Sequence, residues 1–382
     1  MKTICLTLFA ALCLASCAQG GSCACRRHNL DVRGAALMDD STLWDPAMVV
    51  PSMDSIEERD WAFTALGGIN TARLAVKADY FTDDNGESRP EGFAFLDKQL
   101  GFAQKYSLRV ILDMHIPPGG AIQDYRVTPE SEAFWRDEAL KARFVATWTE
   151  IARRYAKDPR IWAYEIMNEP AGPPDDYWNL MKDTMKAIRA IDADRLIMLQ
   201  PDIDWNIRSI QDRNLAYSFH FYSPLEFTHQ GVADNPLFRE LSKIRYPGEA
   251  AGHDGKRRYY DRAAIKEELS YAARVARMTG KPVIIGEFGV STAADEESAG
   301  RWIADVTGAI EDLGLDGYIY WRQIYRGIFD PSKAGHATMA VIDDLSYASP
   351  AQFFGIRPGL AAKDPEFDFA EFYRRFGERR VR

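Results

Sequence analysis

Cysteine is absent from most of this chain. All five cysteines lie within the first 25 residues, and none follows Arg26. Residues 26–382 therefore contain no disulfide, no thiolate nucleophile and no cysteine metal site. An excess of positive charge is also lacking, because the formal net charge is −9. Nucleic-acid binding depends on Lys and Arg that neutralise phosphates, so this charge balance argues against nucleic acid as a partner.

The N-terminus lacks a hydrophobic segment long enough to span a bilayer. The apolar run Ile4 to Ala15 is too short for that and, with Lys2 before it, is typical of the h-region of a secretory signal. The run ends in Leu14-Ala15-Ser16-Cys17, which resembles the lipobox of bacterial lipoproteins. The resemblance implies that residues 1–16 are a signal peptide and that Cys17 becomes the lipidated first residue. The alternative is a plain signal peptide that is cut nearby.

The residues after the lipobox predict where the mature protein resides. Ala18 follows the cysteine, and by the rule known for bacterial lipoproteins a residue other than Asp favours export to the outer membrane. Residues 17–30 then form the lipidated cysteine and a short tether. We expect a protein of the bacterial cell envelope, lipid-anchored to the outer membrane and facing the periplasm or the cell surface. Residues 31–382 contain no Pro/Ser-rich linker that would mark an appended module, so we expect a single domain there. We also expect a monomer.

From Asp31 onward, short β-branched or aromatic runs alternate with amphipathic helical patterns. We predict strands at Val32–Leu37, Ile69–Val76, Leu108–His115, Ile161–Glu169, Arg195–Pro201, Leu215–Tyr222, Pro282–Gly289 and Asp316–Gln323. We predict helices at Ser55–Leu66, Glu91–Tyr106, Glu132–Lys157, Tyr177–Ile191, Arg262–Met278, Glu296–Leu313 and Phe367–Phe376, with a shorter one at Trp205–Arg213.

This alternation, with strands that are apolar on both faces, is typical of an α/β fold of the (β/α)8 TIM-barrel type. An open doubly wound sheet is the competing architecture, and it often carries a Gly-rich phosphate turn after its first strand. Val32–Leu37 has no such turn, so we predict the barrel. Two long connections, 223–261 and 324–364, would then lie at the catalytic face of the barrel.

Polar side chains occur near the C-terminal ends of most predicted strands, where a barrel carries its active site. Buried polar groups are costly unless they are paired, so their shared position indicates one common site. Period-two alternation places His220 with Tyr222, and Asp113 with His115, on one face of each strand. The side chains at these strand ends are Arg73, Asp113, His115, Asn168, Glu169, His220, Tyr222, Glu287 and Trp321.

Glu169 and Glu287 are the chemical centre of this set. Glycoside hydrolysis needs one protonated carboxyl that gives a proton to the leaving oxygen, and one ionised carboxylate that attacks or activates water. We expect Arg73 and Tyr222 to keep Glu287 ionised, and apolar surroundings to raise the pKa of Glu169. The alternative is that either glutamate is a buried ion-pair partner, for example of Arg73.

Asp113 and Glu165 lie deeper along their strands, and we interpret them as carboxylates that brace Arg73 or His115. A metal site is an alternative interpretation, with Asp113, His115, His220 and Glu287 as the candidate ligands. A barrel metallohydrolase of the amidohydrolase kind would need two histidines at the end of its first strand, and Val32–Leu37 has none.

In its ordered motifs the chain resembles glycoside hydrolase family 5, the cellulase family of clan A. The matching residues are Arg73, His115, Asn168-Glu169-Pro170, His220-Phe221-Tyr222, Glu287-Phe288-Gly289 and Trp321. All eight signature positions of that family have a match here in the same strand order. The resemblance implies that Glu169 is the acid/base, that Glu287 is the nucleophile, and that no cofactor is required.

The resemblance also implies roles for the neighbouring side chains. Asn168 would bond the 2-hydroxyl of the substrate, and Tyr222 and Arg73 would hold the nucleophile. The −1 subsite would be lined by His115 and His220, with Trp321 stacked beneath the sugar. The stretch 321–325 departs from the well-studied endoglucanases of the family.

We therefore predict a retaining endo-β-glycosidase that acts on a β-1,4-linked oligo- or polysaccharide, with β-glucan (cellulose) as the first choice of substrate. A β-mannan or another plant β-glycan is the alternative substrate. A catalytically silent, glycan-binding surface lipoprotein is an alternative of another class, which the presence of both glutamates disfavours. The candidate sugar platforms, unless they belong to the core, are Trp44, Trp135, Trp178 and Trp205.

Overall fold

Parallel strands close into an eight-stranded barrel, which confirms the predicted fold. The computed structural model describes residues 30–38, 56–66, 69–120, 128–201, 207–208, 210–232, 237–252, 255–291 and 293–321. Around the barrel the strand order is β1-β10-β9-β6-β5-β4-β3-β2. Their bounds are β1 (Val32–Leu37), β2 (Thr71–Lys77), β3 (Arg109–Ile116), β4 (Ile161–Glu165), β5 (Leu196–Leu199), β6 (Leu215–His220), β9 (Val283–Phe288) and β10 (Gly317–Tyr320).

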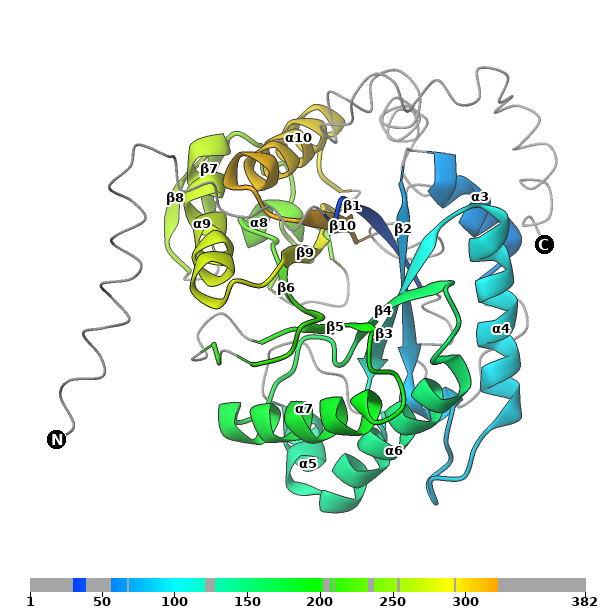
Figure 1. Cartoon of the computed structure of the whole chain (residues 1–382). Helices are drawn as coiled ribbons and strands as arrows, with labels where there is room; N and C mark the ends of the chain where they lie inside the picture. Colours follow the sequence, from blue (N-terminus) through cyan, green and yellow to red (C-terminus); the bar gives the residue numbers. More distant parts are fainter. Residues whose placement is uncertain are drawn as a thin grey trace, which may run out of the picture.

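Helices surround the strands (Figure 1). They are α3 (Glu58–Leu66), α4 (Pro90–Lys105), α5 (Pro129–Arg136), α6 (Glu138–Tyr155), α7 (Pro174–Arg189), α9 (Arg262–Thr279) and α10 (Glu296–Leu313). Local signals set several of these bounds. The side chains of Asp137, Asp261 and Asp295 cap the first backbone N–H groups of α6, α9 and α10. Gly280 and Gly314 end α9 and α10 at φ values of 66° and 67°, where glycine is favoured.

The core has two layers. Between strands and helices pack large side chains such as Trp148, Trp302 and Tyr164, which are fully buried. Inside the barrel the apolar residues include small ones, among them Ala36, Ala163 and Ala216. The small residues leave room for long polar side chains in the barrel interior. Because all the barrel strands are parallel, their C-terminal ends meet at one rim.

The predicted helix Glu132–Lys157 is wrong as a single element. It is divided into α5 and α6 by Asp137, whose backbone is extended at φ −97° and ψ 105°. The same residue caps α6, because its carboxylate accepts hydrogen bonds from the N–H groups of Ala139 and Leu140. A capping aspartate inside an apolar-periodic stretch therefore marked a helix boundary that periodicity alone did not reveal.

The predicted helix Trp205–Arg213 also needs correction, because none of its described residues is helical. The long connection 223–261 contains a short helix, α8 (Leu225–Thr228), and two antiparallel strands, β7 (Gly248–Ala251) and β8 (Arg257–Tyr260). Residues 1–29, which include Cys17, the predicted signal and all of the tether except Leu30, lie outside the described residues. So do the connection 324–364 and the predicted helix Phe367–Phe376.

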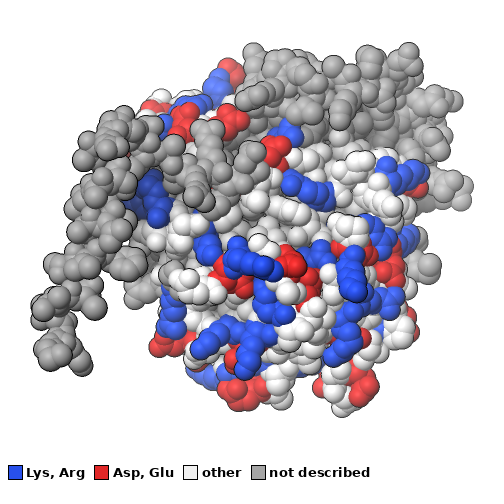
Figure 2. All heavy atoms as spheres, in the orientation of Figure 1, with Lys and Arg blue, Asp and Glu red and all other residues white. Residues whose placement is uncertain are grey.

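Two further features concern the charge of the surface and the length of the helices. Lys and Arg alternate with Asp and Glu over the described part of the face drawn in Figure 2, without a large patch of one sign. In the part of the chain that the structure describes, no helix combines the length and apolar character needed to cross a membrane.

Candidate active site

Arg73 on β2 is the centre of a polar cluster inside the barrel, and its side chain is fully buried. Its Nε donates to Glu165 Oε2 at 2.6 Å and its Nη1 to Glu287 Oε1 at 2.6 Å. Its Nη2 donates to Asn168 Oδ1 at 2.7 Å. Burial opposes the charged form, but the carboxylates of Asp113, Glu165 and Glu287 raise the pKa of Arg73 above its ordinary value. The guanidinium is therefore a permanent positive charge in the barrel.

Asp113 and His115 on β3 form a second part of the cluster. Asp113 Oδ2 lies 2.7 Å from His115 Nδ1 and 3.1 Å from Arg73 Nη2. Burial raises the pKa of Asp113 to about 7, against the influence of Arg73. Burial and then the charge of Arg73 lower the pKa of His115 far below its ordinary value, so the ring is neutral. As expected, the deeper carboxylates Asp113 and Glu165 brace Arg73.

Trp321 and Asn168 complete the surroundings of His115. The rings of Trp321 and His115 stack with centroids 5.2 Å apart and an interplanar angle of 12°. The amide of Asn168 spans two partners, because its Oδ1 accepts from Arg73 while its Nδ2 lies 3.4 Å from His115 Nε2. This fixes which way the Asn168 amide points.

Glu169 does not lie on a strand, although the predicted strand extended to it. β4 ends at Glu165, and Asn168 and Glu169 lie in the turn that follows. The φ of Glu169 is 35°, in the left-handed region that non-glycine residues rarely adopt. Pro170 comes next, and a following proline further restricts the backbone of Glu169. The position of this carboxylate is thus set by a turn and its contacts.

His220 connects the two candidate catalytic carboxylates. Its Nδ1 lies 2.6 Å from Glu169 Oε1 and 3.3 Å from Glu287 Oε2. Carboxylate oxygens of Glu169 and Glu287 approach within 4.8 Å of each other. Burial lowers the pKa of His220 to about 4, so the ring is neutral at pH 7. A neutral imidazole can donate a hydrogen bond to an ionised Glu169 or accept one from a protonated Glu169, so this contact serves both states.

Glu287 on β9 is held by two donors, Arg73 and Tyr222. The hydroxyl of Tyr222 donates to Glu287 Oε2 at 2.9 Å, and burial together with the charge of Glu287 raises the pKa of Tyr222, which keeps the hydroxyl protonated. The expectation that these neighbours keep Glu287 fully ionised is wrong. Burial raises the pKa of Glu287 to about 7, although His220 and Arg73 act to lower it. The predicted rise in the pKa of Glu169 stays a prediction.

The cluster can also be assessed as a metal site. Among the described residues, Glu169, His220 and Glu287 bring one ligand atom each within 4.8 Å of one another, which is close enough to share a cation. Of the ligands suggested by the sequence, Asp113 and His115 instead bond to each other and Asp113 to Arg73. The structure therefore replaces the predicted four-ligand set with a three-residue group that includes both candidate catalytic glutamates.

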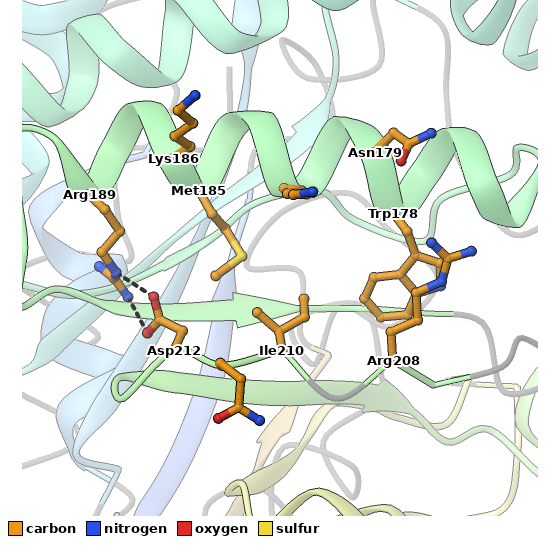
Figure 3. Close-up of a pocket in the computed structure, with 10 residues that line it drawn as sticks. Trp178, Asn179, Met185, Lys186, Arg189, Arg208, Ile210 and Asp212 are labelled. Atoms are coloured by element: carbon orange, nitrogen blue, oxygen red, sulfur yellow. Dashed lines mark hydrogen bonds and ion pairs between the residues drawn. The ribbon is translucent and has the colours of Figure 1, made fainter. Parts of the chain in front are cut away.

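A groove on the outside of the barrel is not part of this cluster. It has a volume of about 480 Å³ and lies between α7 and the chain that follows β5 (Figure 3). Arg189 and Asp212 line it, and they bond to each other at 2.8 and 3.0 Å. The predicted platforms Trp135 and Trp178 are each 3% exposed, so both belong to the core. The other two candidates, Trp44 and Trp205, lie outside the described residues.

Sequence reasoning missed Gln200, which directly follows β5. Its side chain is fully buried, and its Oε1 accepts a hydrogen bond at 3.1 Å from the backbone N–H of Glu169. Every other strand end that contributes to the cluster carries a charged, imidazole or aromatic side chain. A buried amide at the end of the fifth strand was the signal available in the sequence, and an amide by itself does not point to chemistry.

Comparison with known proteins shows what this chain is similar to. The family model for Cellulase (glycosyl hydrolase family 5) matches residues 49–325. Endoglucanase C of Acetivibrio thermocellus is 30% identical over 289 residues, which cover 69% of this chain and 83% of that protein. Cellodextrinase A of Ruminococcus flavefaciens is 27% identical over 268 residues, which cover 68% of this chain and 76% of that protein.

Solved structures show the same fold. The crystal structure of endoglucanase Cel5A from Thermotoga maritima superimposes with a TM-score of 0.66 and covers 84% of this chain and 99% of that one, at 22% sequence identity. At this level of identity the structural likeness supports the barrel architecture and its connectivity.

Proposed function

Because the chain belongs to glycosyl hydrolase family 5, the cellulase family, we propose that it is a retaining endo-β-1,4-glucanase in which Glu287 is the nucleophile and Glu169 the acid/base. The observation that carries the proposal is the approach of the two carboxylates within 4.8 Å. Retaining enzymes hold their carboxyl groups about 5–5.5 Å apart, whereas inverting enzymes need about 6.5–9.5 Å to admit a water. The short separation favours direct attack by Glu287.

In the first step, the ionised Glu287 attacks the anomeric carbon while Glu169 gives its proton to the leaving oxygen. A covalent glycosyl enzyme results. Arg73 and Tyr222 support this step, because they donate to different oxygens of Glu287 and hold the carboxylate in one orientation. Since Arg73 also binds Glu165, movement of the guanidinium is restricted.

In the second step, Glu169 takes a proton from a water molecule, which attacks the glycosyl ester and releases the sugar with net retention. The neutral His220 contacts Glu169 at 2.6 Å and can stabilise both protonation states that the two steps require. The amide of Asn168, fixed by Arg73 and His115, is a candidate partner for a substrate hydroxyl, and Trp321 is a candidate surface for the sugar ring.

The proposed substrate is β-1,4-glucan, that is, cellulose or its soluble fragments. This choice is supported by relatives named endoglucanase and cellodextrinase, which the chain matches over about two thirds of its length. A β-mannan is the alternative substrate.

The proposal is tested by reducing-end release on a panel of soluble β-glucans, mannans and xylans, with the anomeric form of the first product followed by NMR. We expect release of β-anomers from β-1,4-glucan, and loss of that release in Glu287→Gln. An α-anomer as the first product would point to inversion. Binding without release by the unmutated protein would favour a glycan-binding protein, and loss of activity in EDTA would favour a metal at Glu169, His220 and Glu287.

We further propose that the protein is lipid-anchored in the bacterial envelope through Cys17, facing outward from the outer membrane or into the periplasm. The position of Leu30, the last residue of the proposed tether, is compatible with such an anchor. Its carbonyl accepts a hydrogen bond from Arg109 at the N-terminal end of the barrel, so the tether joins the barrel at the end opposite the candidate catalytic residues. Metabolic labelling with a radioactive fatty acid tests the anchor. We expect incorporation in the unmutated protein and none in Cys17→Ser, and soluble, unlabelled protein from both would contradict the proposal.

A further inference from the structure

Gln200 is a polar residue at the site to which neither the sequence pattern nor the family resemblance gave a role. It is fully buried, and its Oε1 accepts a hydrogen bond from the backbone N–H of Glu169 at 3.1 Å. β5 ends one residue earlier, at Leu199. Gln200 is therefore carried by the end of a barrel strand, which is a rigid support.

The turn after β4 is held by hydrogen bonds to backbone carbonyls of the strands on either side of β4, except at Glu169. The N–H of Ile166 donates to the carbonyl of Met198 on β5 at 3.1 Å, and the N–H of Asn168 donates to the carbonyl of Met114 on β3 at 3.1 Å. At Glu169 the partner is a side chain. A side-chain acceptor can be removed by mutation, which a backbone carbonyl cannot.

The backbone of Glu169 needs such support. A left-handed conformation costs a non-glycine residue roughly 1–2 kcal/mol, and it persists only where several contacts determine it. With φ at 35° and Pro170 following, Glu169 would relax towards an extended conformation if its N–H lost its acceptor. That rotation would swing the carboxyl group away from His220 and from the leaving oxygen.

We propose that Gln200 is a positioning residue for the acid/base: it holds the peptide of Glu169 in the left-handed conformation that aims the carboxyl group at the glycosidic oxygen. The inference rests on the proposed role of Glu169 as acid/base. Gln200 acts through Glu169, so its loss impairs proton transfer and leaves the nucleophile Glu287 in place.

The test is the dependence of kcat/KM on the leaving group in Gln200→Met, which keeps the length of the side chain and removes the acceptor. Cellotetraose needs protonation of its leaving oxygen, whereas 2,4-dinitrophenyl cellobioside does not. We expect kcat/KM to fall between about 10- and 100-fold for cellotetraose and less than about 3-fold for the aryl glycoside. Hydrolysis of the glycosyl enzyme also needs Glu169 as base, so kcat for the aryl glycoside should fall, and sodium azide, which attacks without a base, should restore it.

A matched control is Gln99→Met. Gln99 lies on α4, is fully buried, accepts from Trp61 Nε1 at 2.7 Å and donates to the carbonyl of Ile56 at 3.0 Å. Gln99→Met therefore removes the same amide group as Gln200→Met, but from the core between strands and helices, away from the polar cluster. A purely structural effect would lower the melting temperature and change kcat/KM for both substrates equally, as we expect for Gln99→Met.

The outcomes separate this inference from the proposed function. Glu169→Gln should show the same dependence on the leaving group more strongly, and if both substrates lose equally there, the acid/base assignment fails. If Glu169→Gln shows the dependence and Gln200→Met does not, only the role of Gln200 fails. Should Gln200→Met not fold, Gln200→Glu decides, because a carboxyl oxygen can accept the N–H of Glu169 in either protonation state. If Gln200→Glu shows the same dependence on the leaving group as Glu169→Gln, the inference is overturned.

Discussion

The two ends of the barrel use arginine differently. At the N-terminal end, two partly buried aspartates have an arginine of their own: Arg160 binds Asp158, and Arg189 binds both oxygens of Asp212. At the C-terminal end, several carboxylates share the single guanidinium of Arg73. One end is neutralised pair by pair, and the other retains an excess of carboxyl groups.

The difference appears in the pKa values. Hydrogen bonds from Arg160 lower the pKa of Asp158, and the bonds from Arg189 lower the pKa of Asp212 against the effect of burial. Burial instead raises the pKa of both Asp113 and Glu287 to about 7. The N-terminal end is arranged for stability, and the C-terminal end holds groups poised to exchange protons near neutral pH.

The largest expected effect comes from changing a carboxylate to an amide at each end. Glu287→Gln removes the proposed nucleophile, and we expect hydrolysis to fall by about four orders of magnitude or more. Its melting temperature should not fall, because the fold already disfavours the ionised form of Glu287. Asp212→Asn should behave in the opposite way, with an unchanged kcat and a loss of about 1–3 kcal/mol in stability. Thermal denaturation and activity assays of Glu287→Gln and Asp212→Asn measure both effects, and a loss of the same kind in both variants would contradict the comparison.

Removing an arginine should distinguish the ends by stability. Arg73→Met leaves Asp113, Glu165 and Glu287 buried without their shared positive charge, and we expect a loss of about 3–5 kcal/mol in the free energy of unfolding. Arg160→Met removes a single pair near the surface in which both side chains keep some contact with solvent, and should cost about 1 kcal/mol. Urea denaturation measures both values, and equal losses would show that sharing one guanidinium has no special importance.

The pH dependence of stability isolates Glu287. Its folded pKa lies above its unfolded value, so the folded state binds the extra proton between about pH 4.5 and 7, and this contribution to stability is lost as the pH rises through about 7. His115 and His220 act in the opposite direction over part of this window, because burial lowers their pKa values. The useful quantity is therefore the stability of Glu287→Gln relative to the unmutated protein.

We expect that difference to shift in favour of Glu287→Gln by up to about 1.4 kcal/mol per pH unit between pH 5 and pH 7. Urea denaturation at several pH values provides the measurement. A difference that does not change with pH would mean that Glu287 titrates at its ordinary value.

The smallest effect is expected from Tyr222→Phe. Loss of the hydroxyl removes one donor to Glu287 Oε2, so the carboxylate is less stabilised and the pKa of Glu287 rises further. The acidic limb of kcat/KM against pH should move to higher pH, with a modest drop at the optimum. Tyr217→Phe is the control, because the Tyr217 hydroxyl donates to the carbonyl of Arg208 instead, and its pH profile should match that of the unmutated protein.

Much of the fold could be predicted because it depends on local patterns. The bounds predicted for Val32–Leu37 and Glu296–Leu313 are those observed. Apolar periodicity reports which face of an element is buried, and a capping residue reports where a helix begins. Where prediction failed, as at Glu132–Lys157, two local signals competed, and the cap at Asp137 prevailed over the periodicity.

The sequence by itself determined that eight strands would bring polar residues to one rim, and that Glu169 and Glu287 would be among them. Only the tertiary structure decided that one arginine serves several carboxylates, that burial outweighs Arg73 in setting the pKa of Glu287, and that Gln200 supports Glu169. The reason is physical. A pKa and a hydrogen bond depend on distances between residues far apart in the chain, and periodicity contains no information about those distances.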